Sequence, residues 1–156
     1  MSLQINIKSI AEIAKQKREE NAVFKVYLKE QNVKEIDTIV HGLSDKITPQ
    51  IDCTACGNCC ANLRPTATRE EVGKFVEEDE IDKYMYAESI VCKNLKDKKC
   101  SVYADRPEEC RSYPYMDRDN FINRTTGILQ NYAVCPIVFN IFESLKKELK
   151  WSYTVK

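Results

Sequence analysis

The sequence predicts a mainly α-helical protein with one small β-hairpin, in which N-terminal helices precede an irregular domain built around a cysteine cluster. Apolar residues in the first third of the chain recur every three or four positions, as they do on the buried face of a helix. Four cysteines are packed into CTACGNCC at 53–60, and four more follow at wide intervals. The segment IVCKNLKDKKCSVY at 90–103 is typical of a hairpin, with its turn near KDKK and its strands ending in Val and Tyr.

Residues 1–50 are expected to form an N-terminal helical region. Residues 8–48 carry many charges, and from residue 33 onward the apolar positions follow the spacing of one buried stripe. These positions are Val33, Ile36, Ile39, Val40, Leu43 and Ile47. Packing on a core is the ordinary interpretation of such a stripe, and a partner or dimerisation surface is the alternative. His41, the only histidine, is expected on this helix as a surface or satisfied residue.

Residues 51–156 are expected to form a cysteine-cluster domain that ends in a C-terminal helix. Beyond the cysteine loop, Thr68 and Glu71 have the spacing of a capping box. The helix that they begin is expected to bury Val72, Phe75 and Val76, and a second short helix is expected at 79–89. The acidic run EEDE at 77–80 is then a solvated turn.

Two prolines mark the last helices of this domain. Pro107 suits the first turn of a helix that starts near Arg106, and Pro136 suits the start of the C-terminal helix. The apolar residues of CPIVFNIFESLKKELKW recur at helical spacing and supply one buried face. They are Ile137, Val138, Ile141, Phe142, Leu145 and Leu149.

Charge and glycine content exclude several classes of function. The chain has 24 basic and 24 acidic residues, so the basic excess of a nucleic-acid or anionic-membrane surface is missing. A zinc-ribbon nucleic-acid module is disfavoured for the same reason, although KNLKDKK at 93–99 is a small basic loop. The four glycines are too far apart for a dinucleotide fingerprint or a phosphate loop.

The cysteines are expected to be reduced. The N-terminus lacks the apolar core of a signal peptide, and no stretch approaches the ~18 apolar residues of a membrane-spanning helix. The expected location is therefore the cytoplasm, where thiols stay reduced. A disulfide between the adjacent Cys59 and Cys60 would also be strained, because neighbouring Cα atoms lie only about 3.8 Å apart. Scattered structural thiols do not explain four cysteines in eight positions.

Metal binding is the function that this cysteine pattern favours. The predicted ligands are Cys53, Cys56, Cys59, Cys60, Cys92, Cys100, Cys110 and Cys135. Eight cysteines could make two four-thiolate zinc sites. Iron–sulfur clusters often take three thiolates from CxxCxxC and a distant fourth before a proline, as at Cys135–Pro136. The cysteine spacing favours an iron–sulfur cluster, whereas the general frequency of zinc sites favours zinc. We slightly prefer the iron–sulfur cluster.

Residues around the cysteines fit a metal site. Gly57 permits the left-handed backbone that a metal-wrapping loop often needs. If 59–60 is extended, the two thiols point to opposite sides, so they serve different metal atoms or one stays unligated and reactive. A thiolate-bound metal is anionic, and Arg64, Arg106 and Arg111 could donate hydrogen bonds to sulfur. The alternative for these arginines is an ordinary surface role.

The whole pattern resembles the CxxCxxCC family of zinc- or iron-chelating proteins, also called YkgJ-type cysteine cluster proteins. The resemblance rests on CTACGNCC, on SVYADRPEECRSYPY at 101–115 and on the late Cys-Pro, and it covers residues 53–136. All eight cysteines fall on family cysteines. The family usually has Ile where Val102 stands, and often has Gly where Ile137 stands. The resemblance implies metal chelation with no settled reaction, and related cysteine regions in flagellin lysine methylases suggest protein or peptide substrates.

Two hypotheses follow for the function. The first is a metal-binding protein whose partner is a metal ion or cluster, with a protein or peptide partner open and with nucleic acid and membrane not expected. The alternative is a metal-dependent enzyme that modifies peptides or proteins, as an oxidoreductase or methylase component. In that case a reactive thiolate or an open metal site does the chemistry, assisted by Tyr103 or Tyr113. In either case we expect metal to cross-link the loop at 53–60, the hairpin, the helix at 106–112 and the turn at Cys135, since these elements are too short to be stable alone.

Overall fold

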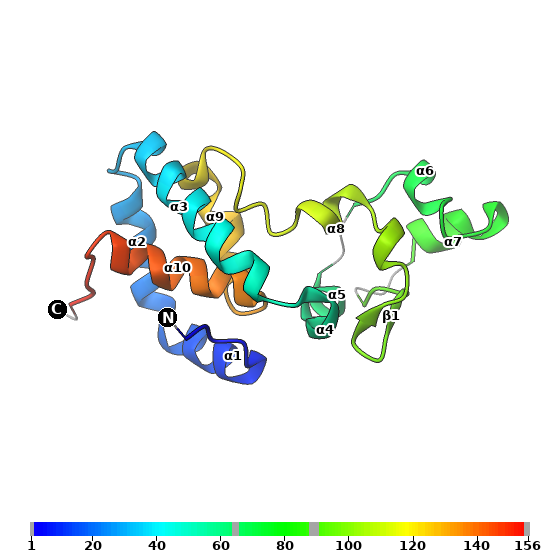
Figure 1. Ribbon diagram of the computed structural model, residues 1–156, viewed down its shortest axis with the longest axis horizontal. Helices are drawn as coiled ribbons and strands as arrows, with labels where there is room; N and C mark the ends of the chain where they lie inside the picture. The colour runs from blue at the N-terminus through cyan, green and yellow to red at the C-terminus, as the bar shows by residue number, and fades with distance from the viewer. Residues whose placement is uncertain (1, 64–65, 88–90, 155–156) are drawn as a thin grey trace. The chain divides into compact units, whose positions relative to one another are not determined.

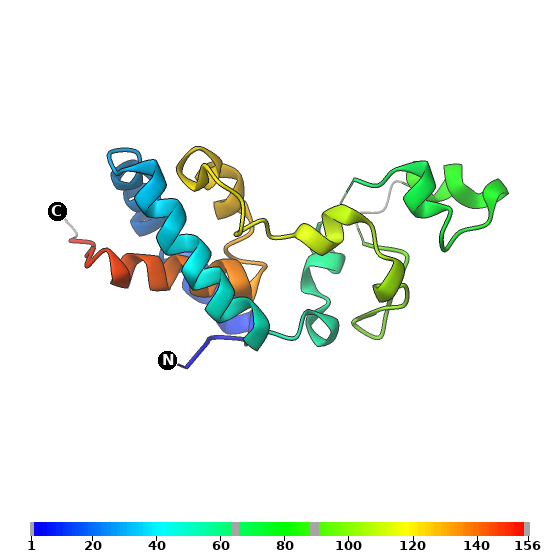
Figure 2. The same cartoon turned by 45° about the horizontal axis from the view of Figure 1, so that its top comes forward.

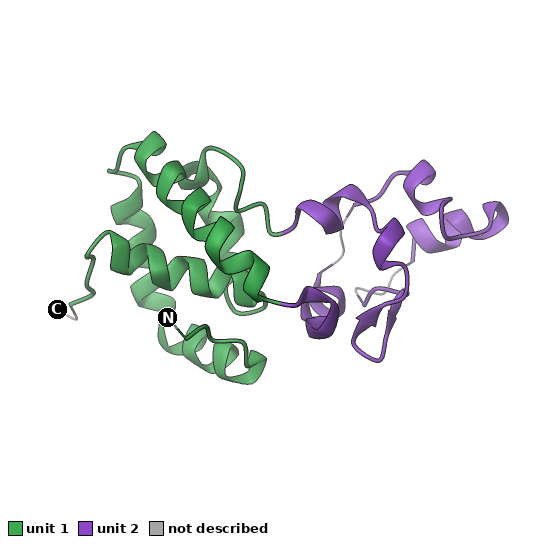
Figure 3. Cartoon of the chain, in the orientation of Figure 1, with its two compact units in different colours: residues 1–51, 114–156 green, residues 52–113 purple. Residues whose placement is uncertain are grey.

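The computed structural model describes residues 2–63, 66–87 and 91–154. It confirms a mainly α-helical chain with one small antiparallel hairpin (Figures 1 and 2). The chain divides into two compact units, coloured separately in Figure 3. Residues 1–51 and 114–156 form the helical unit, and residues 52–113 form the cysteine unit. The C-terminal segment thus groups with the N-terminal helices, whereas the sequence analysis assigned it to the cysteine-cluster domain.

The helical unit begins with three helices: α1 (Ile7–Gln16), α2 (Arg18–Leu28) and α3 (Val33–Ile47), followed by the 3-10 turn η1 (Thr48–Gln50). Asn6 caps α1, and Asn32 caps α3 by accepting hydrogen bonds from the N–H groups of Lys34 and Glu35. The apolar stripe of α3 is buried at four of its expected positions, which are Ile36, Val40, Leu43 and Ile47. Val33 is exposed instead, so the stripe faces a core only from the second turn.

Two helices of the C-terminal segment complete this unit, α9 (Phe121–Gln130) and α10 (Pro136–Glu148). Pro136 occupies the first turn of α10, as predicted. Helix α10 packs against α3 and α1, and α9 packs against α2 and α3. This packing is why 114–156 groups with the N-terminal helices: the expected apolar face of α10 from Ile137 to Leu145 is buried.

Helix α9 was missed by the sequence analysis, and a residue of α3 starts it. Asn120 has φ 60° and supplies no cap with its side chain. The buried carboxylate of Asp37 accepts hydrogen bonds from the N–H groups of Asn120 and Phe121, at 2.8 and 2.9 Å. The cap of α9 is therefore a tertiary contact, which no local sequence signal could reveal.

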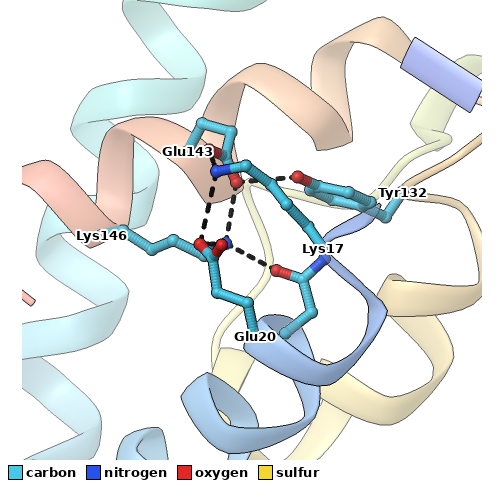
Figure 4. A network of polar contacts seen from close by, with 6 residues as sticks. Lys17, Glu20, Tyr132, Glu143 and Lys146 are labelled. Carbon is cyan, nitrogen blue, oxygen red and sulfur yellow. Dashed lines mark hydrogen bonds and ion pairs between the residues drawn. The ribbon is translucent and has the colours of Figure 1, made fainter. Parts of the chain in front are cut away.

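A partly buried charged network lies within the helical unit (Figure 4). Lys146 is 5% exposed, and its ammonium donates to Glu20 at 2.7 Å and to Glu143 at 2.8 Å. Lys17 pairs with both carboxylates, and the hydroxyl of Tyr132 donates to Glu143. Burial raises the pKa of Glu143, but hydrogen bonds from Lys146 and Lys17 outweigh it, so the pKa lies below its ordinary value. These compensated charges link α10 to the start of α2.

The cysteine unit contains only short elements. In chain order these are α4 (Cys53–Cys56), α5 (Asn58–Asn62), α6 (Arg69–Val72), η2 (Glu78–Glu80), α7 (Ile81–Met85), β1 (Leu95–Lys96), β2 (Lys99–Cys100), η3 (Tyr103–Asp105) and α8 (Glu108–Ser112). The predicted capping box of Thr68 and Glu71 is present. The short helix predicted at 79–89 is α7, which is shorter than expected because it ends at Met85. The acidic run at 77–80, predicted as a turn, forms the 3-10 turn η2.

The hairpin lies where the sequence predicted it, with its turn inside KDKK. Leu95 pairs with Cys100 and Lys96 with Lys99. Asp97 and Lys98 both have positive φ, as a two-residue turn of the type that matches strand twist requires. The strands are two residues long and do not extend to Val and Tyr as expected. Helix α8 begins at Glu108, so Pro107 precedes its first turn.

The cysteine unit has a small apolar core. Among the residues that the structure describes, the buried apolar side chains of 52–113 are those of Val72, Ile81 and Pro107, and the others belong to the helical unit. Arg64 and residues 88–90, on which parts of the sequence predictions fall, lie outside the described residues. Within the described ranges, no helix is both long enough and apolar enough to span a membrane.

Candidate metal centre

The first four predicted ligands lie on α4 and α5, which meet at Gly57. Asp52 caps α4 by accepting a hydrogen bond from the N–H of Thr54 at 2.9 Å. Gly57 has φ +60°, so α4 ends in the left-handed conformation and α5 starts at the next residue. The left-handed backbone predicted for CGNC is confirmed. It folds CTACGNCC into two helical turns.

Adjacent Cys59 and Cys60 are helical rather than extended, which corrects the expectation that their thiols point to opposite sides. Both belong to α5, where neighbouring side chains are about 100° apart around the axis. The two thiols interact, since a hydrogen bond with Cys59 is the largest cause that raises the pKa of Cys60. The pair therefore presents two sulfur atoms toward one region.

The hairpin is docked on this cysteine loop through the backbone. A Cβ built on Gly57 would approach the carbonyl group of Lys98 and would lie 3.1 Å from Cδ1 of Leu95. Glycine is thus required at 57 by close approach as well as by its φ. The N–H of Cys92 donates to the carbonyl oxygen of Cys60 at 2.8 Å. These contacts hold the segments that carry Cys92 and Cys100 beside α5.

Four thiols from four segments interact electrostatically. Burial, together with the charges of Cys60, Cys92 and Cys100, raises the pKa of Cys110 to about 11. Burial also raises the pKa of Cys100, with added contributions from Cys60 and Cys92. Like charges that raise one another's pKa values are close in space. Cys60, Cys92, Cys100 and Cys110 are hereafter called the thiol group.

Cys53 and Cys56 lie at the edge of the thiol group. Although Cys53 as a whole residue is exposed, partial desolvation of its thiol raises its pKa, followed by the charges of Cys56, Asp52 and, more weakly, Cys60. The charge of Arg106 acts in the opposite direction on Cys53. All the cysteines of 52–113 therefore belong to one neighbourhood, because Cys59 bonds to Cys60.

Arg106 and Arg111 have different roles in the structure. The Arg106 guanidinium lies 3.8 Å from the ring centre of Tyr103 and donates to the carbonyl oxygen of that residue at 2.6 Å. Its positive charge partly opposes the rise in the pKa values of Cys53, Cys100 and Cys110, so it lies within electrostatic range of these thiols. Arg111 donates to the carbonyl oxygens of Ala104 and Arg106 and braces this turn.

Two glutamates attach α8, which carries Cys110, to the start of α6. Glu71 accepts a hydrogen bond from the N–H of Glu108 at 2.8 Å. Glu109 accepts one from the N–H of Thr66 at 3.0 Å. Hydrogen bonds from the N–H groups of Glu108 and Thr68 lower the pKa of Glu71. Cys110 is therefore positioned by contacts to a segment far away in the sequence.

Tyr84 and Asn94 belong to this neighbourhood, and the sequence analysis missed both. Asn94 Nδ2 donates a hydrogen bond to the hydroxyl of Tyr84 at 2.8 Å. The hydroxyl also hydrogen-bonds the side chain of Cys92. Burial is the largest cause that raises the pKa of Tyr84, followed by the charge of Cys92. Neither residue falls in a cysteine motif, so only the fold brings them to the thiols.

The remaining predicted ligand, Cys135, belongs to the helical unit. It is 5% exposed and directly precedes α10, and its carbonyl oxygen accepts the N–H of Phe139. His41 also belongs to this unit, with its Nε2 3.7 Å from a carboxylate oxygen of Asp119. All eight cysteines are described, and each is a thiol rather than half of a disulfide.

The thiols of 52–113 are neighbours, but their side chains do not have the geometry of a metal site among the described residues. Across the described residues, no three Cys, His, Asp or Glu side chains converge closely enough to hold a metal ion. The side chains of the thiol group are half-buried, and Cys53 is exposed. What the fold provides is a cluster of soft donors, one nearby cation and a backbone frame that holds them.

Comparison with known proteins gives one match. Residues 52–136 match the family model described as "CxxCxxCC: Putative zinc- or iron-chelating domain". The matched range contains all eight cysteines and covers more than half of the chain. A search of curated proteins and a search of solved structures found no match.

Proposed function

Since this chain belongs to the CxxCxxCC family of zinc- or iron-chelating domains, we propose that it is a metal-binding protein whose cysteine unit holds zinc or an iron–sulfur cluster. The observation that carries this proposal is the set of seven thiols that residues 52–113 bring into one neighbourhood. They come from helices, a loop and a strand, and they are the donors that zinc and iron–sulfur clusters take.

The chemistry of the donor set fits such a group. Thiolate is the ligand common to structural zinc sites and iron–sulfur clusters, whereas hard cations prefer oxygen. The thiol group, Cys60, Cys92, Cys100 and Cys110, has the four donors that one closed site requires. Cys53, Cys56 and Cys59 add further donors beside it. When bound, the metal supplies cross-links between short elements and, if it is iron, a redox centre.

The surrounding residues support a partly buried anionic site. Several thiolates with one metal leave excess negative charge, which favours a cation nearby. Arg106 supplies it, since its charge already acts on Cys53, Cys100 and Cys110. Arg111 supports Arg106 through a hydrogen bond to its carbonyl oxygen at 2.9 Å. We therefore assign Arg106 to charge compensation and Arg111 to holding it in place.

For the identity of the metal we prefer an iron–sulfur cluster, with zinc as the alternative. The preference rests on the CxxCxxC spacing of Cys53, Cys56 and Cys59. Cys135 is kept as a proposed ligand on its position before Pro136 and its place in the family pattern. The helical unit carries this cysteine, whereas the other seven belong to the cysteine unit.

Spectroscopy of anaerobically purified protein tests the proposal. An iron–sulfur cluster gives visible absorption that bleaches on reduction, together with acid-labile sulfide, whereas zinc gives neither. Cys110→Ser and Cys100→Ser are each expected to weaken the affinity for metal by at least about tenfold. Ser101→Ala is the matched control beside a ligand. Full metal content in both cysteine variants would contradict the assignment of the thiol group.

A further inference from the structure

The hydroxyl of Tyr84 lies between Asn94 and the thiol of Cys92. Asn94 Nδ2 is 2.8 Å from this oxygen and is a donor, so the oxygen of Tyr84 accepts. The phenolic proton of Tyr84 is then available to its other partner. That partner is the side chain of Cys92, with which the hydroxyl also forms a hydrogen bond. The three residues make a chain of hydrogen bonds that runs from amide to phenol to sulfur.

Both ends of this chain are fixed by other contacts. The ring of Tyr84 packs edge-on against Phe75, with 5.5 Å between ring centres. The backbone of Cys92 is held at its N–H by Cys60 and at its carbonyl oxygen by the N–H of Leu95. A half-buried phenol in a fixed position keeps its hydrogen bond in one direction.

We propose that Tyr84 is a positioning residue of the metal centre, which donates a hydrogen bond to the metal-bound sulfur of Cys92 and lowers the reactivity of that sulfur. The inference rests on the proposed function, because it takes Cys92 as a ligand. A donor that engages a sulfur lone pair leaves less electron density for attack on an electrophile. Hydrogen bonds to ligand sulfurs also tune the reduction potentials of iron–sulfur clusters, so the same contact would act on iron.

The test measures how fast each cysteine of the Zn²⁺-loaded protein is alkylated by iodoacetamide, read peptide by peptide by mass spectrometry. In this reaction the sulfur displaces iodide and forms a carbon–sulfur bond. Tyr84→Phe removes the hydroxyl and keeps the ring on Phe75. We expect Cys92 to react about threefold to tenfold faster, with metal content and the rates at other cysteines unchanged. Tyr86→Phe is the matched control, because Tyr86 is nearby and 77% exposed.

The possible outcomes separate this inference from the proposed function. Equal rates at Cys92 in wild type and Tyr84→Phe, at equal zinc content, overturn the inference alone. A similar acceleration at every cysteine shows loosened structure instead, and also overturns it. If the wild-type protein binds no zinc and no iron, the proposed function fails and the inference fails with it.

A second variant keeps the inference testable if Tyr84→Phe does not fold. Asn94→Ala leaves Tyr84 in place but removes the donor that orients its hydroxyl. Cys92 is expected to react faster in this variant than in wild type, by a smaller factor than in Tyr84→Phe. The double variant is expected to react no faster than Tyr84→Phe, since both changes act on one chain of hydrogen bonds. An unchanged Cys92 rate in metal-loaded Asn94→Ala overturns the inference.

Discussion

The backbone N–H of Cys92 donates a hydrogen bond to the carbonyl oxygen of Cys60 across 2.8 Å. This bond joins the loop before the hairpin to the helix that ends CTACGNCC. It makes two predicted ligands neighbours through their main chains, whatever their sulfur atoms bind. The cysteine unit therefore has a polar frame of its own, to which metal would add the cross-links between side chains.

Gly57→Ala is expected to disrupt this frame. Alanine is strained at φ +60°, and its Cβ would meet the backbone of Lys98 in the hairpin turn. We expect the cysteine unit to lose about 2 kcal/mol or more of stability, and metal to be released more easily. Urea unfolding of the metal-loaded protein measures the loss of stability, and hydrogen exchange shows whether the loss falls in 52–113.

The matched control for this change is Gly42→Ala in α3. A Cβ at Gly42 meets nothing within 4 Å, and its φ is not in the left-handed range. Alanine there should stabilise the helix by about 0.5–1 kcal/mol and leave metal content unaltered. Equal effects of the two substitutions would show that the approach of Gly57 to Lys98 does not matter.

Loss of metal is expected to open the two units to different extents. Val72, Ile81 and Pro107 are the few buried apolar residues in the described part of 52–113, so we expect this unit to depend on its cross-links. Removing metal with a chelator, or through Cys56→Ala, should abolish most hydrogen-exchange protection in 53–113. The helices α1, α2, α3, α9 and α10 should keep theirs. Native-like protection of the cysteine unit without metal would refute its dependence on metal.

Asp37→Ala is expected to destabilise the helical unit and leave metal binding intact. The carboxylate of Asp37 caps α9 through the N–H groups of Asn120 and Phe121. Its removal leaves a buried N–H without a partner, at a cost of about 2–4 kcal/mol. Thermal unfolding measures the change, with the exposed Asp45→Ala on the same helix as control. A metal content that falls with Asp37→Ala and not with Asp45→Ala would show that the cap also supports the site.

The charged network should give the helical unit an acid-sensitive stability. The pKa of Glu143 is lowered from 4.5 in the folded protein, despite burial, by Lys146 and Lys17. As pH falls, the unfolded chain takes up this proton first, so the stabilisation is present above about pH 4.5 and is lost as pH falls through the lower folded pKa.

Glu143→Gln removes this titration. Its unfolding free energy should be lower at neutral pH and should decline less steeply between pH 5 and 3 than in wild type. Urea unfolding at a series of pH values measures both slopes, and exposed Glu148→Gln serves as control. Parallel curves for wild type and Glu143→Gln would exclude Glu143 as the source of the acid sensitivity.

Local signals predicted the parts of the fold that local chemistry determines. The capping box at Thr68, the proline at the start of α10 and the turn of the hairpin each depend on a few consecutive residues. The left-handed Gly57 follows from the same kind of signal. Helix α9 was missed because Asp37, far away in the sequence, supplies its cap.

The candidate site was predicted in its sulfur donors and missed in its other polar partners. Cysteine spacing is visible in the sequence because the family motif is dense. Tyr84 and Asn94 carry no such signal, since α7 and the hairpin bring them to Cys92 only in the folded unit. The helical conformation of Cys59 and Cys60 depends on the turn at Gly57, which the extended interpretation had not taken into account.

The metal content of the native protein tests the central claim most directly. Protein purified in parallel with and without oxygen is analysed for zinc, iron and acid-labile sulfide, with chain concentration from amino-acid analysis. We expect at least about one metal per chain in the anaerobic preparation, and its loss in Cys56→Ala. Iron with sulfide would identify a cluster, and zinc without sulfide a zinc site. Less than one metal per chain in both preparations would contradict a metal-binding function for this cysteine unit.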